Sequence, residues 1–316
     1  METIELGGTG QLVSRVAMGG SPIGGHGWGD VDDAEAVAAV RRAFDLGVNF
    51  FDTADVYGFG YSEQVLSRAL GRRRREVVIA TKFGVRWSDN AKPWKDISPG
   101  YLRKALDASL RRLRIDCIPL YYVHWPDGKT PIVDTMAELV RCRQQGKIRW
   151  IGLSNFSAEQ VREATSVTPL QALQVQFSLA DRLKAAELLP LARELGATLV
   201  TWGSLAEGLL TGKYDARSTF AGDDRRRRYD NFRGEKFAEN LRLVEGLRRV
   251  ARALGRTPAQ VALRWLLDTP DVGCALFGAK RPAQVEENVQ AAGWRLSAAE
   301  YQALKMQETP IERKSA

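Results

Sequence analysis

An apolar, strand-like run followed by an amphipathic, helix-like run recurs eight times along the chain, and this repetition limits the possible folds more than any other feature. The strand-like runs lie near 14–20, 49–53, 76–82, 117–124, 148–153, 170–177, 197–203 and 272–277. The helix-like runs lie near 33–46, 62–70, 99–113, 132–145, 157–164, 185–195, 236–254 and 282–291. Thr257 and Pro258 mark the start of an additional helix, 258–268, before the last strand.

Eight strand–helix units without a break in composition predict an α/β fold, a single (β/α)8 TIM barrel over residues 1–316. An open, doubly wound sheet is the alternative, but no Gly-x-Gly-x-x-Gly lies in the first strand–helix turn. The glycine-rich run at 7–10 precedes every predicted helix and is interpreted as the turn of an N-terminal β-hairpin. The long stretch 206–235 has no regular pattern, and loops of this length are usually lids or disordered.

Four chemically active side chains follow the carboxyl ends of the second, third and fourth predicted strands. Asp52 ends the second strand and Tyr57 lies on its loop, Lys82 ends the third, and His124 ends the fourth. In a barrel these ends meet at one rim, where catalytic side chains lie. Taken singly, a strand histidine is more often a core residue, and a strand-end lysine is more often a solvated charge. Four such residues on one rim predict an active site instead.

These four side chains together suit general acid catalysis by the tyrosine. A phenol with a pKa of about 10 is a poor acid at neutral pH, and the charge of Lys82 is expected to lower the pKa of Tyr57. Asp52 would hold Lys82 in place and protonated, and His124 would orient a substrate oxygen. The adjoining turn is expected to lead into a helix that Ser62 caps. The alternative for this stretch is a buried structural acid beside a core tyrosine.

Six motifs resemble those of the aldo-keto reductase family and occur in the same order over more than 200 residues. They lie at 52–63 (Asp-Thr-Ala-x-x-Tyr-Gly-x-Gly-x-Ser-Glu), 79–82, 123–125, 152–156, 208–214 and 277–288. The chain is more similar to the bacterial members related to potassium-channel β subunits than to the human carbonyl-reducing members. The resemblance implies reversible reduction of an aldehyde or ketone with NADPH, without a Rossmann fold.

The resemblance also implies which residues bind the cofactor. Trp202 would stack on the nicotinamide, and a polar set would hold its carboxamide: Ser154, Asn155 and Gln174. The pyrophosphate loop would comprise Gly203, Ser204, Leu205, Gly208 and Lys213. The adenosine end would comprise Gly278, Lys280, Gln284, Glu287 and Asn288, with Arg281 as a weaker neighbour, and Gly20 completes the cofactor set.

Two positions depart from the family pattern at the adenosine end. Gly278 stands where many members carry a lysine, and Gln284 stands where they carry an arginine. Lys280 would replace that charge, so NADPH is expected over NADH, with less support than in those members. Trp202 and Gly203 replace the commoner Tyr-Ser, a change that ring stacking tolerates.

Three tryptophans lie on loops after predicted strands one, three and four and are expected to wall an apolar substrate pocket: Trp28, Trp87 and Trp125. His26 and Phe59 would join them. Ordinary packing explains any one of these residues equally well, and the sequence does not name the carbonyl compound.

Composition narrows the remaining classes of function. The net charge of +8 includes two arginine clusters, 72–75 and 225–228, but neither is interleaved with aromatics as a nucleic-acid platform would be. Three widely spaced cysteines and the absence of signal-like and membrane-length segments predict a cytoplasmic protein. No metal site, nucleic-acid partner or membrane contact is expected, and the oligomeric state stays open. A cofactor-binding sensor or scaffold subunit with little turnover is the rival within the same fold.

Overall fold

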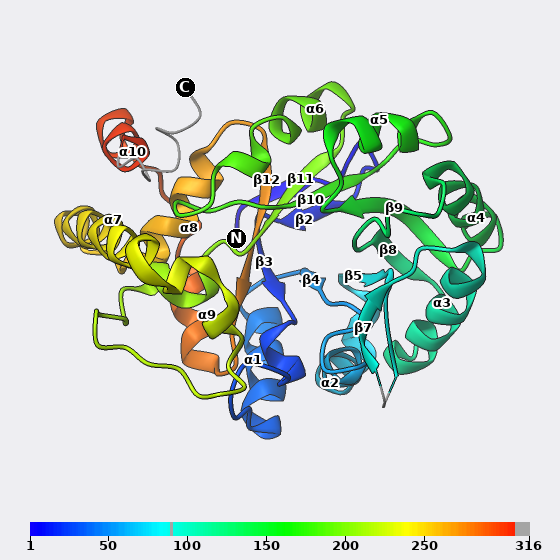
Figure 1. Cartoon of the computed structure of the whole chain (residues 1–316), viewed down its shortest axis with the longest axis horizontal. Helices are drawn as coiled ribbons and strands as arrows, with labels where there is room; N and C mark the ends of the chain where they lie inside the picture. The colour runs from blue at the N-terminus through cyan, green and yellow to red at the C-terminus, as the bar shows by residue number, and fades with distance from the viewer. Residues whose placement is uncertain (89–90, 307–316) are drawn as a thin grey trace.

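The computed structural model describes residues 1–88 and 91–306 and contains a closed barrel of eight parallel strands surrounded by helices (Figure 1). In order around the barrel the strands are β3 (Val16–Gly19), β4 (Phe50–Asp52), β5 (Val78–Phe83), β8 (Ile118–Val123), β9 (Ile148–Ser154), β10 (Ala172–Gln176), β11 (Thr198–Trp202) and β12 (Val272–Gly278). The strands follow one another around the barrel in chain order, and the barrel closes where β12 pairs with β3. The predicted (β/α)8 architecture is therefore confirmed.

One helix follows each barrel strand. These helices are α1 (Asp33–Asp45), α2 (Tyr61–Leu70), α3 (Pro99–Leu113), α4 (Ile132–Gln144), α5 (Ala158–Thr165), α6 (Leu188–Glu194), α7 (Gly234–Ala253) and α9 (Pro282–Val289). The additional helix α8 (Pro258–Asp268) precedes β12 as expected, and Thr257 caps it through a reciprocal capping box with Gln260. The sequence pattern missed the final helix, α10 (Ala298–Lys305).

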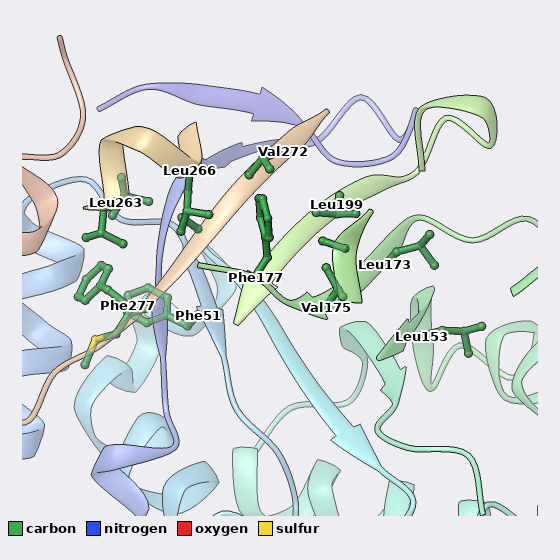
Figure 2. Packing of buried hydrophobic residues seen from close by; sticks show 14 of the residues in the cluster. Phe51, Leu153, Leu173, Val175, Phe177, Leu199, Leu263, Leu266, Val272 and Phe277 are labelled. Atoms are coloured by element: carbon green, nitrogen blue, oxygen red, sulfur yellow. The ribbon is translucent and has the colours of Figure 1, made fainter. Parts of the chain in front are cut away.

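Alternate residues along each strand face two different apolar layers. Phe50 and Val78 point into the barrel, while their neighbours Phe51 and Ile79 join the larger layer between strands and helices. Figure 2 shows part of this outer layer, with Leu263 and Leu266 of α8 beside the strand β12 that they cover. Both faces of the sheet are buried, which explains why the strands appear in the sequence as continuous apolar runs.

Two small hairpins lie at the two ends of the barrel strands. The N-terminal hairpin pairs β1 (Thr3–Glu5) with β2 (Leu12–Ser14), and its Leu6 joins the inner layer near the start of β11, where Gly7 N–H bonds the Thr198 hydroxyl at 2.8 Å. A second hairpin, β6 (Val85–Ser88) with β7 (Ala91–Lys95), follows β5 and was not anticipated. The N-terminal hairpin therefore lies at the amino end of the strands, and the second lies at the carboxyl end.

The stretch 206–235 contains no α-helix or strand before α7 starts at Gly234. It is mostly irregular and contains three short 3₁₀ segments, Ala206–Thr211, which a kink at Glu207 and Gly208 interrupts, Arg225–Arg228 and Asp230–Phe232. Its arginine turn contacts the loop after β3, because Arg225 N–H bonds the Gly27 carbonyl at 3.0 Å. The segment thus reaches across the carboxyl end of the barrel.

Candidate active site

Three adjacent barrel strands bring Asp52, Lys82 and His124 to one rim. Asp52 is the last residue of β4, Lys82 lies near the end of β5, and His124 directly follows β8. In the parallel register, Asp52 lies opposite Ala80 and Lys82 lies opposite Tyr122. Since Lys82 falls on the inward-facing set of β5, its side chain extends inside the barrel toward Asp52.

Lys82 forms a fully buried ion pair with Asp52. Its Nζ lies 2.5 Å from Asp52 Oδ1 and 2.8 Å from the Thr53 carbonyl oxygen. Burial lowers the pKa of Lys82, but the charge of Asp52 and its hydrogen bond more than offset this, so the pKa lies above its ordinary value. Gln174 Nε2 donates to the second carboxylate oxygen of Asp52 at 2.8 Å. The lysine is therefore held charged, with one direction left open.

That open direction faces Tyr57. Lys82 Nζ lies 3.5 Å from the Tyr57 hydroxyl, and the Tyr57 ring meets the His124 ring edge-on, with centroids 5.7 Å apart. A tight turn holds the tyrosine: Gly58 has φ 59°, and a Cβ at Gly58 would lie 2.1 Å from the Gly24 carbonyl oxygen. The structure thus places the four rim residues, Asp52, Tyr57, Lys82 and His124, around one point.

The pKa of Tyr57 differs from the sequence expectation. Burial raises the pKa of Tyr57 and outweighs the charge of Lys82, which lowers it, so the net direction is upward rather than downward. Sequence reasoning identified the lysine but not the degree of burial, which depends on the whole barrel mouth. Lys82 therefore limits the rise in the pKa and stabilises a phenolate when one forms.

His124 is a neutral, buried imidazole. Burial lowers its pKa well below the usual range, and the charges of Lys82 and Arg225 lower it further. Its Nδ1 has no hydrogen-bond partner within the described part of the chain. A neutral imidazole beside a phenol can donate one hydrogen bond to a substrate oxygen without competing as an acid.

The predicted capping role of Ser62 is wrong. Helix α2 starts at Tyr61, and its N-cap is Gly60, which has φ 92° and no side chain to bond the first turn. The Ser62 hydroxyl instead donates to the Gly20 carbonyl at 2.7 Å and contacts the Thr53 hydroxyl at 2.8 Å. Ser62 therefore joins the loops after β3 and β4 beneath the site.

A cleft of about 930 Å³ extends from Tyr57 and His124 across the barrel mouth to the first turns of α9. Every predicted cofactor residue lines it except Gly20 and the weaker neighbour Arg281. The lining residues are Ser154, Asn155, Gln174, Trp202, Gly203, Ser204, Leu205, Gly208, Lys213, Gly278, Lys280, Gln284, Glu287 and Asn288. Gly20 lies just beneath, where its N–H bonds the Asp52 carbonyl at 2.6 Å and a Cβ would lie 2.6 Å from Ser62 Oγ. Close packing accounts for that glycine.

A polar network fixes the side chains at the ends of β9 and β11. Trp202 Nε1 donates to Asn155 Oδ1 at 3.0 Å, and Asn155 Nδ2 donates to the His124 carbonyl at 3.0 Å and to Ser154 Oγ at 2.9 Å. Asn155 adopts φ 64°, a conformation that asparagine tolerates better than most residues. The indole and the amide are therefore oriented together by the fold.

The far half of the cleft is cationic. Burial and the charges of Arg226 and Lys280 lower the pKa of Lys213, and burial with Arg226 and Arg281 lowers that of Lys280. Lys280 Nζ also donates to the carbonyls of Trp28 at 2.9 Å and Asp30 at 3.1 Å, which ties the loop after β3 to the end of β12. Mutually repelling cations lining a cleft form a site for an anion.

Sequence reasoning missed several charged residues in this cleft, among them Arg225 and Glu207. Glu207 lies in a left-handed turn (φ 53°), and burial together with the charge of Asp181 raises the pKa of its carboxyl to about 7. Arg225 comes from the arginine cluster 225–228 of the stretch 206–235, for which the sequence suggests a lid without singling out any residue. No local signal identifies either residue, because the fold of 206–235 alone brings them into the cleft.

The three predicted pocket tryptophans have different positions. Trp28 and Trp125 line the cleft, and Trp125 meets the Trp202 ring at 6.4 Å. Trp87 does not line it; its ring lies 6.0 Å from Phe59, whose ring lies 4.9 Å from His26 at the cleft edge. Trp87 therefore contacts this edge of the cleft through Phe59.

Two other features of the described residues bear on function. No group of three or more His, Cys, Asp or Glu side chains in 1–88 and 91–306 is arranged to hold a metal ion. Among the helices in the same ranges, none combines the length and apolarity that crossing a membrane requires.

Known proteins share both the sequence and the fold. Residues 15–307 match the model of the aldo/keto reductase family. The aldo-keto reductase YhdN of Bacillus subtilis is 37% identical over 300 residues, covering 94% of this chain and 90% of that protein. The NADP(+)-labelled aldo-keto reductase yakc of Schizosaccharomyces pombe is 40% identical over 82% of this chain and 78% of its own length.

Two further relatives carry more specific names. The NADH-specific methylglyoxal reductase of Escherichia coli is 34% identical and covers 99% of this chain and 100% of its own. The structure of glycerol dehydrogenase AKR11B4 from Gluconobacter oxydans superimposes with a TM-score of 0.89 at 39% identity, covering 96% of this chain and 94% of that one. Relatives thus differ in the nicotinamide cofactor that their names state.

Proposed function

The chain belongs to the aldo/keto reductase family, and from that premise we propose how the residues of its barrel mouth divide the work of the reaction. It is an NAD(P)H-dependent oxidoreductase that reduces an aldehyde or a ketone to the alcohol. Neither the site nor the relatives favour the alternative of a sensor subunit with little turnover.

The cleft fits a nicotinamide dinucleotide. Its volume of about 930 Å³ is within the usual range for small-molecule sites, and it has an oriented indole at one end and cations at the other. Ser154, Asn155 and Gln174 would hold the carboxamide, and Trp202 would stack on the ring. The turn from Gly203 to Gly208 and Lys213 would hold the diphosphate, and the adenosine would lie against the residues from Gly278 to Asn288. When bound, the reduced nicotinamide supplies a hydride to the carbonyl carbon.

The remaining steps belong to the rim residues. His124 donates a hydrogen bond to the carbonyl oxygen and orients it beside the Tyr57 hydroxyl. Tyr57 gives its phenolic proton to that oxygen as the carbon gains the hydride, so the product is the neutral alcohol. Lys82, 3.5 Å away, stabilises the phenolate until solvent returns a proton, and Asp52 keeps Lys82 charged and in place.

The observation that carries this proposal is the contact of a buried, ion-paired lysine with a tyrosine hydroxyl beside a neutral histidine. The test is NADPH consumption by the purified protein over a panel of carbonyl compounds, from 4-nitrobenzaldehyde to keto-sugars. We expect rapid oxidation of NADPH with the most reactive aldehydes. If the protein binds NADPH but consumes neither NADPH nor NADH with any compound, it is a binding protein and the proposal fails.

We further propose that NADPH is preferred over NADH. Lys213, Arg226 and Lys280 line the cationic end of the cleft, and the charge of Arg281 acts on Lys280, so a 2′-phosphate would relieve the repulsion among these cations. A hydrogen bond to a charged group contributes about 1.5–3 kcal/mol, so the phosphate should gain at least tenfold in affinity. In fluorescence titrations, Lys280→Ala should weaken NADPH more than NADH.

Lys280 also ties down the loop after β3, so its replacement is expected to weaken both cofactors somewhat. The decisive quantity is therefore the ratio of the two dissociation constants. Lys104→Ala, on the outer face of α3, is the matched control and should leave that ratio unchanged. If Lys280→Ala lowers the affinity for NADPH and for NADH by the same factor, Lys280 does not bind the 2′-phosphate.

The cysteines support a proposal about the compartment. Cys117, Cys142 and Cys274 are free thiols, and burial raises the pKa of Cys142 to about 11 and that of Cys274 to about 12. Free, unreactive thiols suit a reducing environment, and we place the protein in the cytoplasm. Cell fractionation tests this, and recovery from an oxidising compartment would contradict it.

A further inference from the structure

Arg225 is held in the cleft by contacts on several sides. Its Nη1 donates to the Ser21 hydroxyl at 3.2 Å and its Nη2 donates to the Tyr229 hydroxyl at 2.5 Å. The guanidinium also lies over the Trp28 ring at 5.0 Å and the Tyr229 ring at 5.3 Å. An arginine stacked and bonded in this way is pre-organised, so binding a ligand loses little side-chain entropy.

The positive charge of Arg225 has no carboxylate partner among the described residues, since no acidic oxygen lies within 4.0 Å of it. Its neighbour Arg226 contrasts with it, because Arg226 Nη1 pairs with Asp224 at 2.6 Å. Glu207 is the acidic residue whose charge interacts with Arg225, and burial keeps that carboxyl half-protonated near neutral pH, with a pKa of about 7. A guanidinium has five N–H donors, and Ser21 and Tyr229 accept two of them.

The Arg225 guanidinium also acts on the proposed catalytic pair. Burial lowers the pKa of His124, and the charges of Lys82 and Arg225 add to that effect. For Tyr57, burial raises the pKa while Lys82 and Arg225 oppose the rise. Arg225 lines the same cleft as Tyr57 and His124, so its guanidinium borders the space in which the substrate carbonyl is proposed to bind.

Arg226 differs from Arg225 in its partners, although both guanidinium groups lie over the Trp28 ring. Burial lowers the pKa of Lys213, and the charge of Arg226 lowers it further. Arg226 Nε also bonds the Glu207 carbonyl at 3.2 Å, beside the turn assigned to the diphosphate. Arg226 is thus bound to Asp224 and to the diphosphate turn, whereas Arg225 has no carboxylate partner among the described residues.

We propose that Arg225 determines substrate specificity by binding an anionic group of the carbonyl compound. The preferred substrates are then aldehydes or ketones that carry a carboxylate or a phosphate a few atoms from the carbonyl. The planar guanidinium suits both groups, and Trp28 and Trp125 supply apolar walls for the linking carbons. This inference rests on the carbonyl reduction proposed above and names its substrate class.

The experiment compares matched charged and neutral substrates. 4-Carboxybenzaldehyde and 4-nitrobenzaldehyde have almost the same shape and differ in charge, and glyceraldehyde 3-phosphate with glyceraldehyde forms the phosphate arm. The ratio of kcat/KM within each pair is measured for the wild type, Arg225→Gln, Arg225→Lys and Arg227→Gln. Arg227 is the matched control, because it is an exposed arginine of the same turn that does not line the cleft.

Arg225→Gln should lower kcat/KM for the charged member of at least one pair by about 10- to 100-fold, the loss expected for a hydrogen bond to a charged group. Both members of a pair lose the effect of the Arg225 charge on Tyr57 and His124, so the neutral members should fall as well but by much less. The charged-to-neutral ratio of kcat/KM is therefore the decisive quantity. Arg225→Lys, which keeps the charge, should recover most of the lost ratio, and Arg227→Gln should match the wild type. The arm that responds identifies carboxylate or phosphate as the group bound.

Two binding measurements separate this inference from the proposed function. NADPH should bind Arg225→Gln with the same affinity as it binds the wild type. 4-Carboxybenzyl alcohol should bind the NADP+ complex of Arg225→Gln at least about tenfold more weakly than it binds the NADP+ complex of the wild type. Equal losses for charged and neutral substrates, or weakened NADPH binding with unchanged ratios, would overturn the role of Arg225. If the alcohol binds in an Arg225-dependent way but no aldehyde is reduced, the proposed reaction fails and the anion site stands.

Discussion

Replacing Lys82 with methionine removes the charge that the buried site depends on and leaves Asp52 without its cation. The two charged atoms are 2.5 Å apart and both side chains are buried. With an effective dielectric constant of about 20, Coulomb's law gives an attraction of about 7 kcal/mol at that separation. In the variant, the hydrogen bond from Gln174 still stabilises the Asp52 carboxylate, and partial protonation of Asp52 further reduces the cost of burying it without a cation. We therefore expect Lys82→Met to lower the free energy of unfolding by about 3–5 kcal/mol at neutral pH.

The loss should depend on pH in a definite direction. Burial raises the pKa of Asp52, and the charge of Lys82 is the largest influence opposing that rise, so the pKa climbs further in Lys82→Met. Between the unfolded and the folded pKa the folded variant then binds more protons than the unfolded chain, and its stability falls as pH rises through that window. The difference from the wild type should be larger near pH 8 than near pH 5.

Urea unfolding followed by tryptophan fluorescence measures the effect. The double variant Asp52→Asn with Lys82→Met has no charge at either position of this buried pair and should be more stable than Lys82→Met alone. Lys147→Met is the matched control, because Lys147 pairs with Asp107 at 2.7 Å on the surface and its loss should change stability by less than about 1 kcal/mol. A loss in Lys82→Met as small as in Lys147→Met, or one that does not change with pH, would refute the reasoning.

Two further predictions concern the segment 206–235. If it closes over the bound cofactor, trypsin cleavage at the exposed Arg227 and Arg228 should slow when NADPH is added, and unchanged cleavage kinetics with saturating cofactor would count against a lid. Because burial raises the pKa of Glu207 to about 7, its carboxyl gains negative charge above that pH and should repel the diphosphate, so NADPH affinity should fall a few-fold between about pH 6 and about pH 8. Glu207→Gln should lose most of this pH dependence in the same titration, and an unaltered dependence would assign it to another group.

The barrel could be predicted because its signals are local. Strands such as Val78–Phe83 are buried on both faces and appear as unbroken apolar runs, and Thr257 with Pro258 carries a helix start in its own chemistry. The hairpin at 85–95 escaped prediction, since short, polar strands that include Pro93 show no such pattern. The prediction that Ser62 caps α2 is wrong because Gly60 is the N-cap. The Ser62 hydroxyl is therefore free to donate to the Gly20 carbonyl, which is distant in sequence.

The candidate site divides in the same way. The convergence of Asp52, Tyr57, Lys82 and His124 could be predicted because each lies at a strand end or on the loop that follows, and the barrel topology fixes where strand ends meet. The direction of the pKa shift of Tyr57 could not be predicted, because burial raises the pKa by more than the charge of Lys82 lowers it. Arg225 enters the cleft only through the tertiary fold of an irregular segment, for which sequence periodicity provides no guide.

Proton donation by Tyr57 is the central claim, and Tyr57→Phe tests it most directly because the ring, its packing against His124 and the cofactor contacts all remain. The measurement is the single-turnover rate of NADPH oxidation with 4-nitrobenzaldehyde, alongside an NADPH titration of the same variant. The account predicts NADPH affinity within about threefold of the wild type and a rate lower by about 10²–10⁴, the usual contribution of a positioned acid. Carbonyl reduction by Tyr57→Phe at close to the wild-type rate, with NADPH bound equally well, would contradict it.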